Sequence, residues 1–335
     1  MADDPLAALS AAQRHAAHQA ITTVLGAAAI PTVRPLTGGV SGAFVFLIEA
    51  SGRQWVLRIE GVASPLRNPY QYLSMSIAAQ ESIAPRIHFL DTDARVVIMD
   101  FIEDRPLERY PDGALGLARA IGTMLNKLQT APLFPCFMSY PDIVHRLWTH
   151  VCKTGLFVDG LLDAASRRLI QIRETYDLEA EHFVSSHNDV LPRNVLFDGK
   201  RLWLIDWEGA YRNDPLVDLA TALDNFAPSP ELEEVLLLAW LGHQPDQLMR
   251  NRLAQARALT RLYYAGVLFS ASALAPRDRP DSSLSALSSE QFEQAIRNGK
   301  LVAGTSETSH ALGKMFLASF LSGAIPPGLP PMYMR

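Results

Sequence analysis

The first third of the chain has short apolar runs separated by polar and glycine-containing turns. The runs are rich in β-branched and aromatic residues and are too short for a stable helix, which is the pattern of β-strands. They cover residues 43–48, 54–59, 86–90 and 95–102. Residues 65–82, between the second and third runs, have helical spacing. This pattern predicts a small sheet with one helix inserted between its strands.

Beyond residue 102 the pattern changes to longer segments with apolar residues at helical spacing. We predict helices over residues 112–129, 140–154, 160–176, 214–226, 230–242, 245–274, 289–302 and 307–321. Residues 275–289 are polar and contain two prolines, which indicates a flexible loop. The proline-rich residues 326–331 cannot continue a helix and predict an extended tail.

A very short apolar hairpin interrupts the helical pattern. Residues 195–205 hold two apolar segments around an Asp-Gly pair, which is a strong signal for a hairpin turn. Polar residues lie at both ends of this hairpin, since Asp189 and Asn194 precede its first strand and Asp206 follows its second. The hairpin should therefore bring two carboxylates and one amide close together.

These three side chains have the chemistry that metal-assisted phosphoryl transfer needs. A Mg²⁺ ion bound to a nucleotide takes few protein ligands, and those are hard oxygens such as the ones that Asn194 and Asp206 offer. An aspartate on the preceding loop, here Asp189, can accept the proton of an attacking hydroxyl. A single such aspartate is more often a turn or cap residue. The set at this spacing therefore carries the prediction of a kinase.

Three motifs resemble the aminoglycoside phosphotransferase and choline kinase superfamily: H-N-D-V-L-P-R-N at residues 187–194, L-I-D-W-E-G-A at 204–210 and D-P-L-V-D-L-A at 214–220. Their H-N-D and D-W-E groups are more similar to the choline, ethanolamine and thiamine kinase branch than to typical antibiotic kinases. The resemblance implies an α+β, bilobal protein-kinase-like fold. A small antiparallel-sheet lobe over residues 1–102 would bind the nucleotide. A large, mostly helical lobe over residues 103–335 would carry the catalytic loop and the acceptor site.

The resemblance also implies a role for each polar residue of these motifs. Asp189 would be the catalytic base, and Asn194 and Asp206 would bind magnesium. His187 would orient the loop, although a buried histidine with satisfied hydrogen bonds is an alternative. Asp218 would open a helix and hold the catalytic loop. The implied cofactor is Mg²⁺, with ATP as the phosphoryl donor.

The predicted sheet should supply the phosphate contacts. Gly38, Gly39 and Ser41 lie in a turn before the strand at residues 43–48, and glycine lets the backbone approach phosphates closely. An ordinary hairpin turn is the alternative, because the loop matches no strict phosphate-binding motif. Arg58, in the next strand, stands where protein kinases keep the lysine that contacts the α and β phosphates. Arginine there resembles the choline kinases, and its planar group can bind phosphate through two donors. A surface salt bridge is the alternative.

The partner of Arg58 and the adenine site are less clear from the sequence. The helix predicted at residues 65–82 has no glutamate in its middle, so Glu81 near its end and Glu60 are both candidates for that partner. By resemblance, the end of the last strand would contact the adenine. Those residues are Met99, which core packing also explains, Asp100, Phe101 and Ile102.

The acceptor must place its hydroxyl beside Asp189. Aromatic faces near a carboxylate suit an ammonium group, at about 0.5 to 2 kcal/mol per face. Candidates are Trp207, Glu208, Tyr211, Asp224, Tyr263 and Tyr264. Such residues on amphipathic helices are otherwise core. The tryptophan-rich C-terminal segment of many choline kinases is not evident in the sequence, so choline is not selected over other acceptors.

The composition is that of a globular enzyme. The 335 residues, 48% of them hydrophobic, are enough for two lobes with a substantial core. The formal charge of −5 argues against a nucleic-acid partner and is compatible with a cationic substrate. We find neither a secretory signal nor an apolar run that could cross a bilayer, so we expect a cytoplasmic protein with no membrane partner. Cys136 and Cys152 are then expected to be reduced packing residues.

Three functions remain compatible with the sequence. The first is an ATP-dependent kinase that phosphorylates a hydroxyl of a small molecule, with an amino alcohol like choline, ethanolamine or thiamine favoured. The second is a kinase of aminoglycosides or other antibiotics that uses the same residues. The third is a non-catalytic nucleotide-binding protein, against which the retention of all three central polar residues argues. The sequence does not set the oligomeric state.

Overall fold

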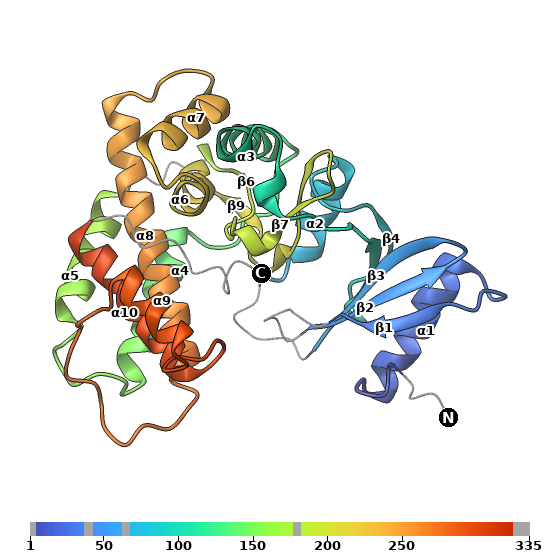
Figure 1. Cartoon of the computed structure of the whole chain (residues 1–335), viewed down its shortest axis with the longest axis horizontal. Helices are drawn as coiled ribbons and strands as arrows, with labels where there is room; N and C mark the ends of the chain where they lie inside the picture. The colour runs from blue at the N-terminus through green and yellow to red at the C-terminus, as the bar shows by residue number, and fades with distance from the viewer. Residues whose placement is uncertain (1–4, 37–42, 62–67, 177–181, 324–335) are drawn as a thin grey trace.

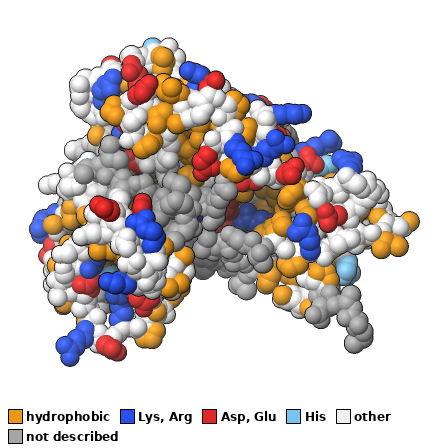
Figure 2. All heavy atoms as spheres, in the orientation of Figure 1, with side chains coloured by type: hydrophobic (Ala, Val, Ile, Leu, Met, Phe, Trp, Pro, Cys, Tyr) orange, Lys and Arg blue, Asp and Glu red, His pale blue; other side chains and the backbone are white. Residues whose placement is uncertain are grey.

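The computed structural model describes residues 5–36, 43–61, 68–176 and 182–323. A part built on a β-sheet lies beside a larger helical part, as Figure 1 shows. The predicted α+β, two-part architecture is confirmed. Acidic and basic side chains are interspersed on the face seen in Figure 2, with hydrophobic groups scattered among them.

The sheet is antiparallel, and its strands follow the order β1-β2-β3-β5-β4. These strands are β1 (Thr32–Pro35), β2 (Ala43–Ala50), β3 (Arg53–Glu60), β4 (Ile87–Asp91) and β5 (Val96–Asp100). All but β1 correspond to predicted runs. β1 is short and mostly exposed, so it has no apolar pattern from which it could be predicted.

Helix α1 (Ala11–Leu25), which we did not predict, packs on one face of the sheet. It begins with a capping box, in which the side chains of Ser10 and Gln13 each accept a hydrogen bond from the backbone N–H of the other. Its buried side chains form a common core with the residues of the sheet that face it. This core contains Ala17, Ala20, Ile21, Phe46, Ile48, Trp55, Leu57, Ile59, Val96 and Ile98.

The opposite face of the sheet packs against helix α2 (Gln71–Gln80) and the helical part. Side chains alternate between the two faces of a strand, so Val56 and Met99 enter this second core while their neighbours in sequence face α1. Arg58 lies on the same face as Val56. Helix α2 begins later than the pattern of residues 65–82 indicated. The second core spans both sides of residue 102, and a lobe boundary there stays a prediction.

The helices of the larger part agree with the predicted positions. They are α3 (Gly113–Gln129), α4 (Tyr140–Lys153), α5 (Asp163–Thr175), α6 (Pro215–Phe226), α7 (Pro230–Leu241), α8 (Gln247–Ser272), α9 (Ser289–Arg297) and α10 (Ser306–Ser322). The long helix α8 packs between α4 and α10 in a third core (Figure 1). None of the described helices is long and apolar enough to span a membrane.

Two short antiparallel ladders frame the central motifs. One is the predicted hairpin of β7 (Val195–Phe197) and β8 (Leu202–Leu204). The other joins β6 (Val184–Ser186) to β9 (Tyr211–Asn213). The hairpin turn needs its glycine, because Gly199 has a φ of +91° and a Cβ there would lie 2.6 Å from Nη1 of Arg105.

The segment predicted as a loop at residues 275–289 is irregular. It is tethered by Asp281, whose carboxylate accepts hydrogen bonds from His310 at 2.8 Å and Lys314 at 2.5 Å, both on α10. The tail predicted at residues 326–331 lies outside the described residues.

Candidate active site

A buried carboxylate on helix α6 holds the backbone of the central loop. Asp218 accepts hydrogen bonds from the backbone N–H groups of His187, at 2.8 Å, and Asn188, at 2.6 Å. Asn188 has a φ of +63°, so the loop reverses direction at this point. Burial raises the pKa of Asp218 to about 6, although the two N–H groups oppose that shift. Asp218 lies in the first turn of α6, and the N-cap of that helix is Asp214, whose side chain accepts from the N–H of Leu216.

His187 connects this loop to the strand that precedes Asp206. Its Nε2 donates to the backbone carbonyl of Ile205 at 2.9 Å, and its ring lies edge-on to Trp207 at 4.7 Å. The side chain of Asn188 donates to the carbonyl of Gly209 at 2.9 Å. The loop is therefore bonded to both ends of the D-W-E turn, which fits the orienting role expected of His187.

The carboxylate of Asp189 is held by three donors. Its Oδ2 accepts from Nδ2 of Asn194 at 2.8 Å and from Arg193 at 3.1 Å. Its Oδ1 accepts from the hydroxyl of Tyr264 at 2.9 Å. The sequence predicted Tyr264 only as an acceptor contact, and it gave no role to Arg193. Spacing could have indicated Arg193, four residues after Asp189, whereas Tyr264 comes from α8 and no local pattern could have revealed its contact.

Asn194 and Asp206 offer the oxygen atoms that a magnesium ion requires. Nδ2 of Asn194 points at Asp189, which leaves its Oδ1 as the acceptor, and its backbone carbonyl accepts from Ile205 at 3.0 Å. Asp206 has a left-handed φ of +65° and a side chain that is 33% exposed. The described residues contain no group of three or more His, Cys, Asp or Glu that could hold a metal ion by itself. One carboxylate and one amide nevertheless fit an ion that arrives on a nucleotide, because such an ion keeps phosphate and water ligands.

Arg58 faces these residues from strand β3. Its Nη2 lies 3.2 Å from Asp206, 3.8 Å from Glu60, and in direct contact with Glu208. Burial alone would lower the pKa of Arg58, but these three carboxylates outweigh it and raise that pKa. Its Nε is buried and has no partner among the described residues. A buried donor without an acceptor fits an incoming phosphate oxygen.

Of the two candidate partners for Arg58, the structure brings only Glu60 to it. Glu81 lies at the C-terminal end of α2 and makes no contact with Arg58 in the described part of the chain. Glu208 is the nearest acid, and it was predicted as an acceptor contact and not as a partner of Arg58.

The residues predicted to contact the nucleotide, through its phosphates or its base, are only partly placed. Gly38, Gly39 and Ser41 lie outside the described residues. Met99 is buried in the second core on the face of the sheet that carries Arg58.

Two further residues of that prediction have other partners. The Asp100 carboxylate pairs with His88 at 2.6 Å, and the N–H of Phe101 donates to Gln54 at 3.4 Å. Ile102 follows in the connection that leads to the helical part. A contact between these residues and adenine stays a prediction.

The predicted acceptor residues divide into two groups. Trp207 is buried in the second core, and Asp224 is held by Arg257 and Arg261, each at 2.9 Å, so its charge is already compensated. The tyrosines instead form a chain of rings that begins at Asp189. In that chain Tyr264 contacts Tyr263 at 5.5 Å and Phe316 at 5.6 Å, and Tyr263 contacts Tyr140 at 5.8 Å.

Tyr211 lies near Tyr263, one of the tyrosines of this chain of rings. Its side chain is 3% exposed, and its hydroxyl has no partner among the described residues. Burial raises the pKa of Tyr211 well above 10, and the same holds for Tyr140, Tyr263 and Tyr264. We call these four residues the tyrosine group. All four therefore present neutral hydroxyls at neutral pH.

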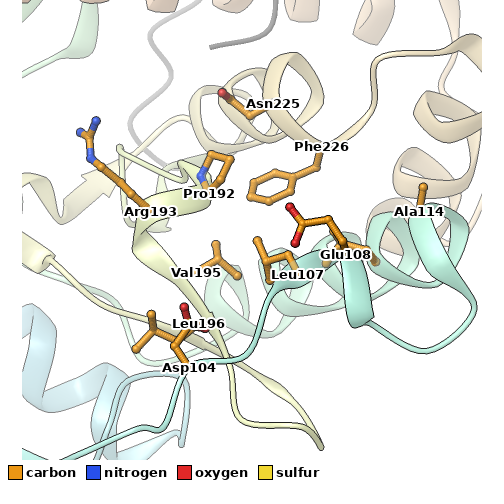
Figure 3. A pocket seen from close by; sticks show the side chains of 11 residues that line it. Asp104, Leu107, Glu108, Ala114, Pro192, Arg193, Val195, Leu196, Asn225 and Phe226 are labelled. Atoms are coloured by element: carbon orange, nitrogen blue, oxygen red, sulfur yellow. The ribbon is translucent and has the colours of Figure 1, made fainter. Parts of the chain in front are cut away.

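A cavity of about 490 Å³ lies on another side of the central loop, and the sequence gave no sign of it. Its walls come from the connection after β5, the start of α3, the loop and the end of α6, as Figure 3 shows. Glu108 points into it toward Phe226, while Arg193 lies at its edge. The walls are mostly apolar, including Leu107 and Val195.

Comparison with known proteins identifies the family. The model of the phosphotransferase enzyme family matches residues 32–254, more than half of the 335-residue chain. The chain belongs to this family. This phosphotransferase is 45% identical over 198 residues to the protein LicA of Haemophilus influenzae, a match that spans 57% of the chain and 73% of that protein. The resemblance inferred from the motifs is confirmed.

Solved structures confirm the fold of this phosphotransferase. It is similar to a choline/ethanolamine kinase family protein from Mesorhizobium loti, with 20% identity and a TM-score of 0.62 over 93% of this chain and all of that one. It is also similar to the choline kinase LicA from Streptococcus pneumoniae, with 15% identity and a TM-score of 0.60 over 86% of this chain and 97% of that one. The expected bilobal, kinase-like fold is therefore correct, and the chain is an enzyme that transfers phosphoryl groups.

Proposed function

We propose that this phosphotransferase is an ATP-dependent kinase that phosphorylates the hydroxyl of a small cationic amino alcohol of the choline and ethanolamine type. The observation that carries the proposal is the contact between Asp189 and Tyr264. It places the carboxylate that would take the proton at the start of an aromatic group. An acceptor bound against those rings has its hydroxyl beside the base.

The residues around Asp189 divide the work of the reaction. Arg193 and Asn194 hold Oδ2, so the carboxylate keeps one orientation, and Oδ1 lies beside the hydroxyl of Tyr264, where the acceptor would bind. Oδ1 then accepts the hydroxyl proton as the oxygen attacks the γ-phosphate. Orientation of this kind lowers the barrier because the reacting atoms need not be assembled during the reaction.

A bound Mg²⁺ would supply charge neutralisation on the phosphates. Oδ1 of Asn194 and the carboxylate of Asp206 would hold it. Arg58, with its unpaired buried Nε, would bind phosphate oxygens from the side of the sheet.

The tyrosine group supports a cationic acceptor. Neutral rings attract an ammonium group through their faces, and the negative charge of Asp189 adds to that attraction. The buried hydroxyl of Tyr211 has no partner among the described residues, so it would gain a hydrogen bond from a polar ligand that reached it. The solved relatives whose names include choline or ethanolamine kinase agree with this choice, since they share the fold.

The alternative acceptor is an aminoglycoside or another antibiotic. A spectinomycin phosphotransferase and a macrolide phosphotransferase share the fold, at 13% and 19% identity. We set the non-catalytic alternative aside, because the chain belongs to an enzyme family and keeps Asp189, Asn194 and Asp206. A cytoplasmic location stays a prediction.

A panel of acceptors tests the proposal. Choline, ethanolamine, thiamine and an aminoglycoside are each incubated with Mg²⁺ and ATP or GTP, and the phosphorylated product is measured by mass spectrometry. We expect turnover of the amino alcohols, and a loss on the order of 10² to 10⁴ in turnover for Asp189→Ala. Asp278→Ala, at an exposed loop residue, is the control. Exclusive turnover of the aminoglycoside would favour the alternative, and full activity of Asp189→Ala would exclude its role as base.

A further inference from the structure

Helix α2 lacks the acidic residue that kinases use to hold their phosphate-binding side chain. In protein kinases a glutamate of the corresponding helix pairs with the lysine of the third strand. The sequence of α2, Q-Y-L-S-M-S-I-A-A-Q, contains no Asp or Glu. Glu81, directly after the helix, does not reach Arg58. Another part of the chain must therefore hold this arginine.

The nearest acid to Arg58 comes from the other side of the site. Glu208 contacts Nη2 of Arg58 directly, and the two residues are 150 positions apart in sequence. Glu208 lies in a single helical turn, η4 (Trp207–Gly209), that begins immediately after Asp206. A hydrogen bond to the loop that carries Asp189 fixes this turn, because the carbonyl of Gly209 accepts from the side chain of Asn188. The position of Glu208 is thus set by the same loop that carries Asp189.

A second support reaches Arg58 through helix α2. Glu60, on the same strand and the same face, lies 3.8 Å from Arg58 and is buried. Its other oxygen accepts a hydrogen bond of 2.7 Å from Nε2 of Gln71, at the start of α2. An amide on the helix therefore acts through Glu60, where protein kinases place a carboxylate on the helix itself.

We infer that Glu208 is the positioning residue of Arg58, with the Glu60–Gln71 pair as a second support, and that this arrangement replaces the helix glutamate of other kinases. The inference rests on the proposed function in one respect only, namely that Arg58 binds nucleotide phosphates. Asp206 cannot fill the positioning role by itself, because its carboxylate is also the expected ligand of Mg²⁺. A cation bound by Asp206 would compete with Arg58 for the carboxylate, and Glu208 and Glu60 would then hold the guanidinium.

The geometry leaves one donor of Arg58, its Nε, without a partner among the described residues. Nη2 is taken by the carboxylates, whereas Nε is buried. A guanidinium fixed on one side by carboxylates can present its remaining N–H groups in a defined plane, which suits bidentate contact with phosphate. Without Glu208 the long side chain would lose part of this order, and nucleotide binding would weaken.

The test compares Glu208→Gln with Glu208→Asp and with the control Glu293→Gln, which makes the same change at an exposed residue of α9. The dissociation constant of ADP is measured without acceptor, with and without Mg²⁺, and the thermal midpoint is measured for each variant. We expect Glu208→Gln to weaken ADP binding about 10-fold to 100-fold, because the charge-assisted hydrogen bond to Arg58 is replaced by a weaker neutral one. Glu208→Asp keeps the charge but shortens the reach, so we expect an intermediate loss. The control should bind ADP like the wild type.

Steady-state kinetics distinguish a positioning role of Glu208 from a direct contact with the acceptor. They use the acceptor that the panel described above shows to be phosphorylated. A positioning role raises the KM for ATP and leaves the KM for the acceptor unchanged. A rise in the KM for the acceptor with unchanged ADP binding would overturn the inference and return Glu208 to the acceptor site. Unchanged ADP binding in Glu208→Gln, with no other effect, would also overturn it. If Glu208→Gln lowers the thermal midpoint, its loss of ADP binding could reflect instability. The ADP binding of Glu208→Asp then tests the inference instead.

Failure of the proposed function gives a different result. If no acceptor is phosphorylated but the wild type binds ADP, the proposed activity is in question while the effect of Glu208 on nucleotide binding is still measured. If the wild type binds no ADP, Arg58 has no phosphate to hold and the inference fails with it.

Discussion

The catalytic loop and Arg58 lie on opposite sides of one site and are held by different forces. The loop is fixed by hydrogen bonds that its backbone N–H groups donate to Asp218, a residue with no exposed surface. Arg58 is fixed by side-chain contacts with acids that are partly exposed, such as Asp206 and Glu208. Breaking a buried hydrogen bond to the backbone leaves an unpaired N–H group and is costly. An ion pair near water can give up one partner for another at little cost.

This difference indicates a division of labour. The side that carries Asp189, the proposed base, is held in place before any ligand arrives, because the hydrogen bonds to Asp189 and Asp218 are internal. The side proposed to hold the phosphates has one donor without a partner among the described residues, Nε of Arg58, and it shares the carboxylate of Asp206 with the expected metal site. It is therefore the side that a nucleotide would reorganise.

The largest effect should follow from breaking the buried anchor with Asp218→Asn. Asparagine offers one acceptor oxygen for two N–H groups, so one of them would be left unpaired at a cost of about 1 to 3 kcal/mol. A displaced loop misplaces Asp189, and a shift of about 1 Å can lower turnover on the order of 10². Steady-state turnover and the thermal midpoint measure both effects. Asp278→Asn, in an exposed loop, is the control.

Asp218→Asn should also change how the thermal midpoint depends on pH. Burial raises the pKa of Asp218 from 3.8 to about 6, so between these values the folded protein holds a proton that the unfolded chain has lost. This group alone therefore lowers stability as pH rises from about 4 to 6. Asp218→Asn should remove that contribution from the pH dependence of the thermal midpoint. An unchanged pH profile and unchanged turnover would contradict the anchoring role.

A smaller effect is expected from Tyr264→Phe, which removes one donor from Asp189 and keeps the ring. We expect turnover to fall about tenfold, because a hydrogen bond to a charged group is lost while Arg193 and Asn194 still hold the other oxygen. The ring contact with Tyr263 should persist, so the KM of a cationic acceptor should change little. Unchanged turnover would mean that Tyr264 contributes only its ring.

The smallest effect should come from Asp281, a partly exposed carboxylate that pairs with Lys314 and accepts a hydrogen bond from His310. Burial opposes the shift, but hydrogen bonds from Lys314 and His310 lower the pKa of Asp281 from 3.8 to about 2. This group therefore stabilises the fold above about pH 4 and loses that contribution as pH falls toward 2. Because solvent screens the pair, Asp281→Asn should cost about 1 kcal/mol or less at neutral pH.

The measurement is the thermal midpoint of Asp281→Asn and of the wild type between pH 2 and pH 6. The difference between the two should shrink at the acid end. A difference that is constant across this range would show that the ion pair does not carry the effect. Arg277, which contributes to the environment of His310, is left unchanged in both proteins.

Local patterns predicted most of the fold, and the central motifs predicted the family. The hairpin between Asn194 and Asp206 was readable because its Asp-Gly turn and apolar strands lie within a few residues of each other. Helix α1 was missed although Ser10 and Gln13 form a capping box, because its apolar residues are mainly alanines and give little helical contrast.

Contacts between distant segments could not be predicted in this way. The pairing of Arg58 with Glu208 joins positions 150 residues apart, and the bond from Tyr264 to Asp189 joins positions 75 residues apart. No periodicity encodes such contacts, because they arise only when the sheet, the loop and α8 are packed together. The roles of these residues in binding and catalysis remain predictions.

The core shared by α2, the sheet and the helical part also affects how the enzyme could be recombined with its relatives. The chain enters this core at α2, passes through β4 and β5, and crosses the connection after Asp100 to α3, which belongs to the same core. A chimera joined at that connection would cut through one continuous interior and separate α2 from the side chains it evolved against. Exchange of acceptor specificity is therefore better pursued by replacing single side chains than by grafting whole halves.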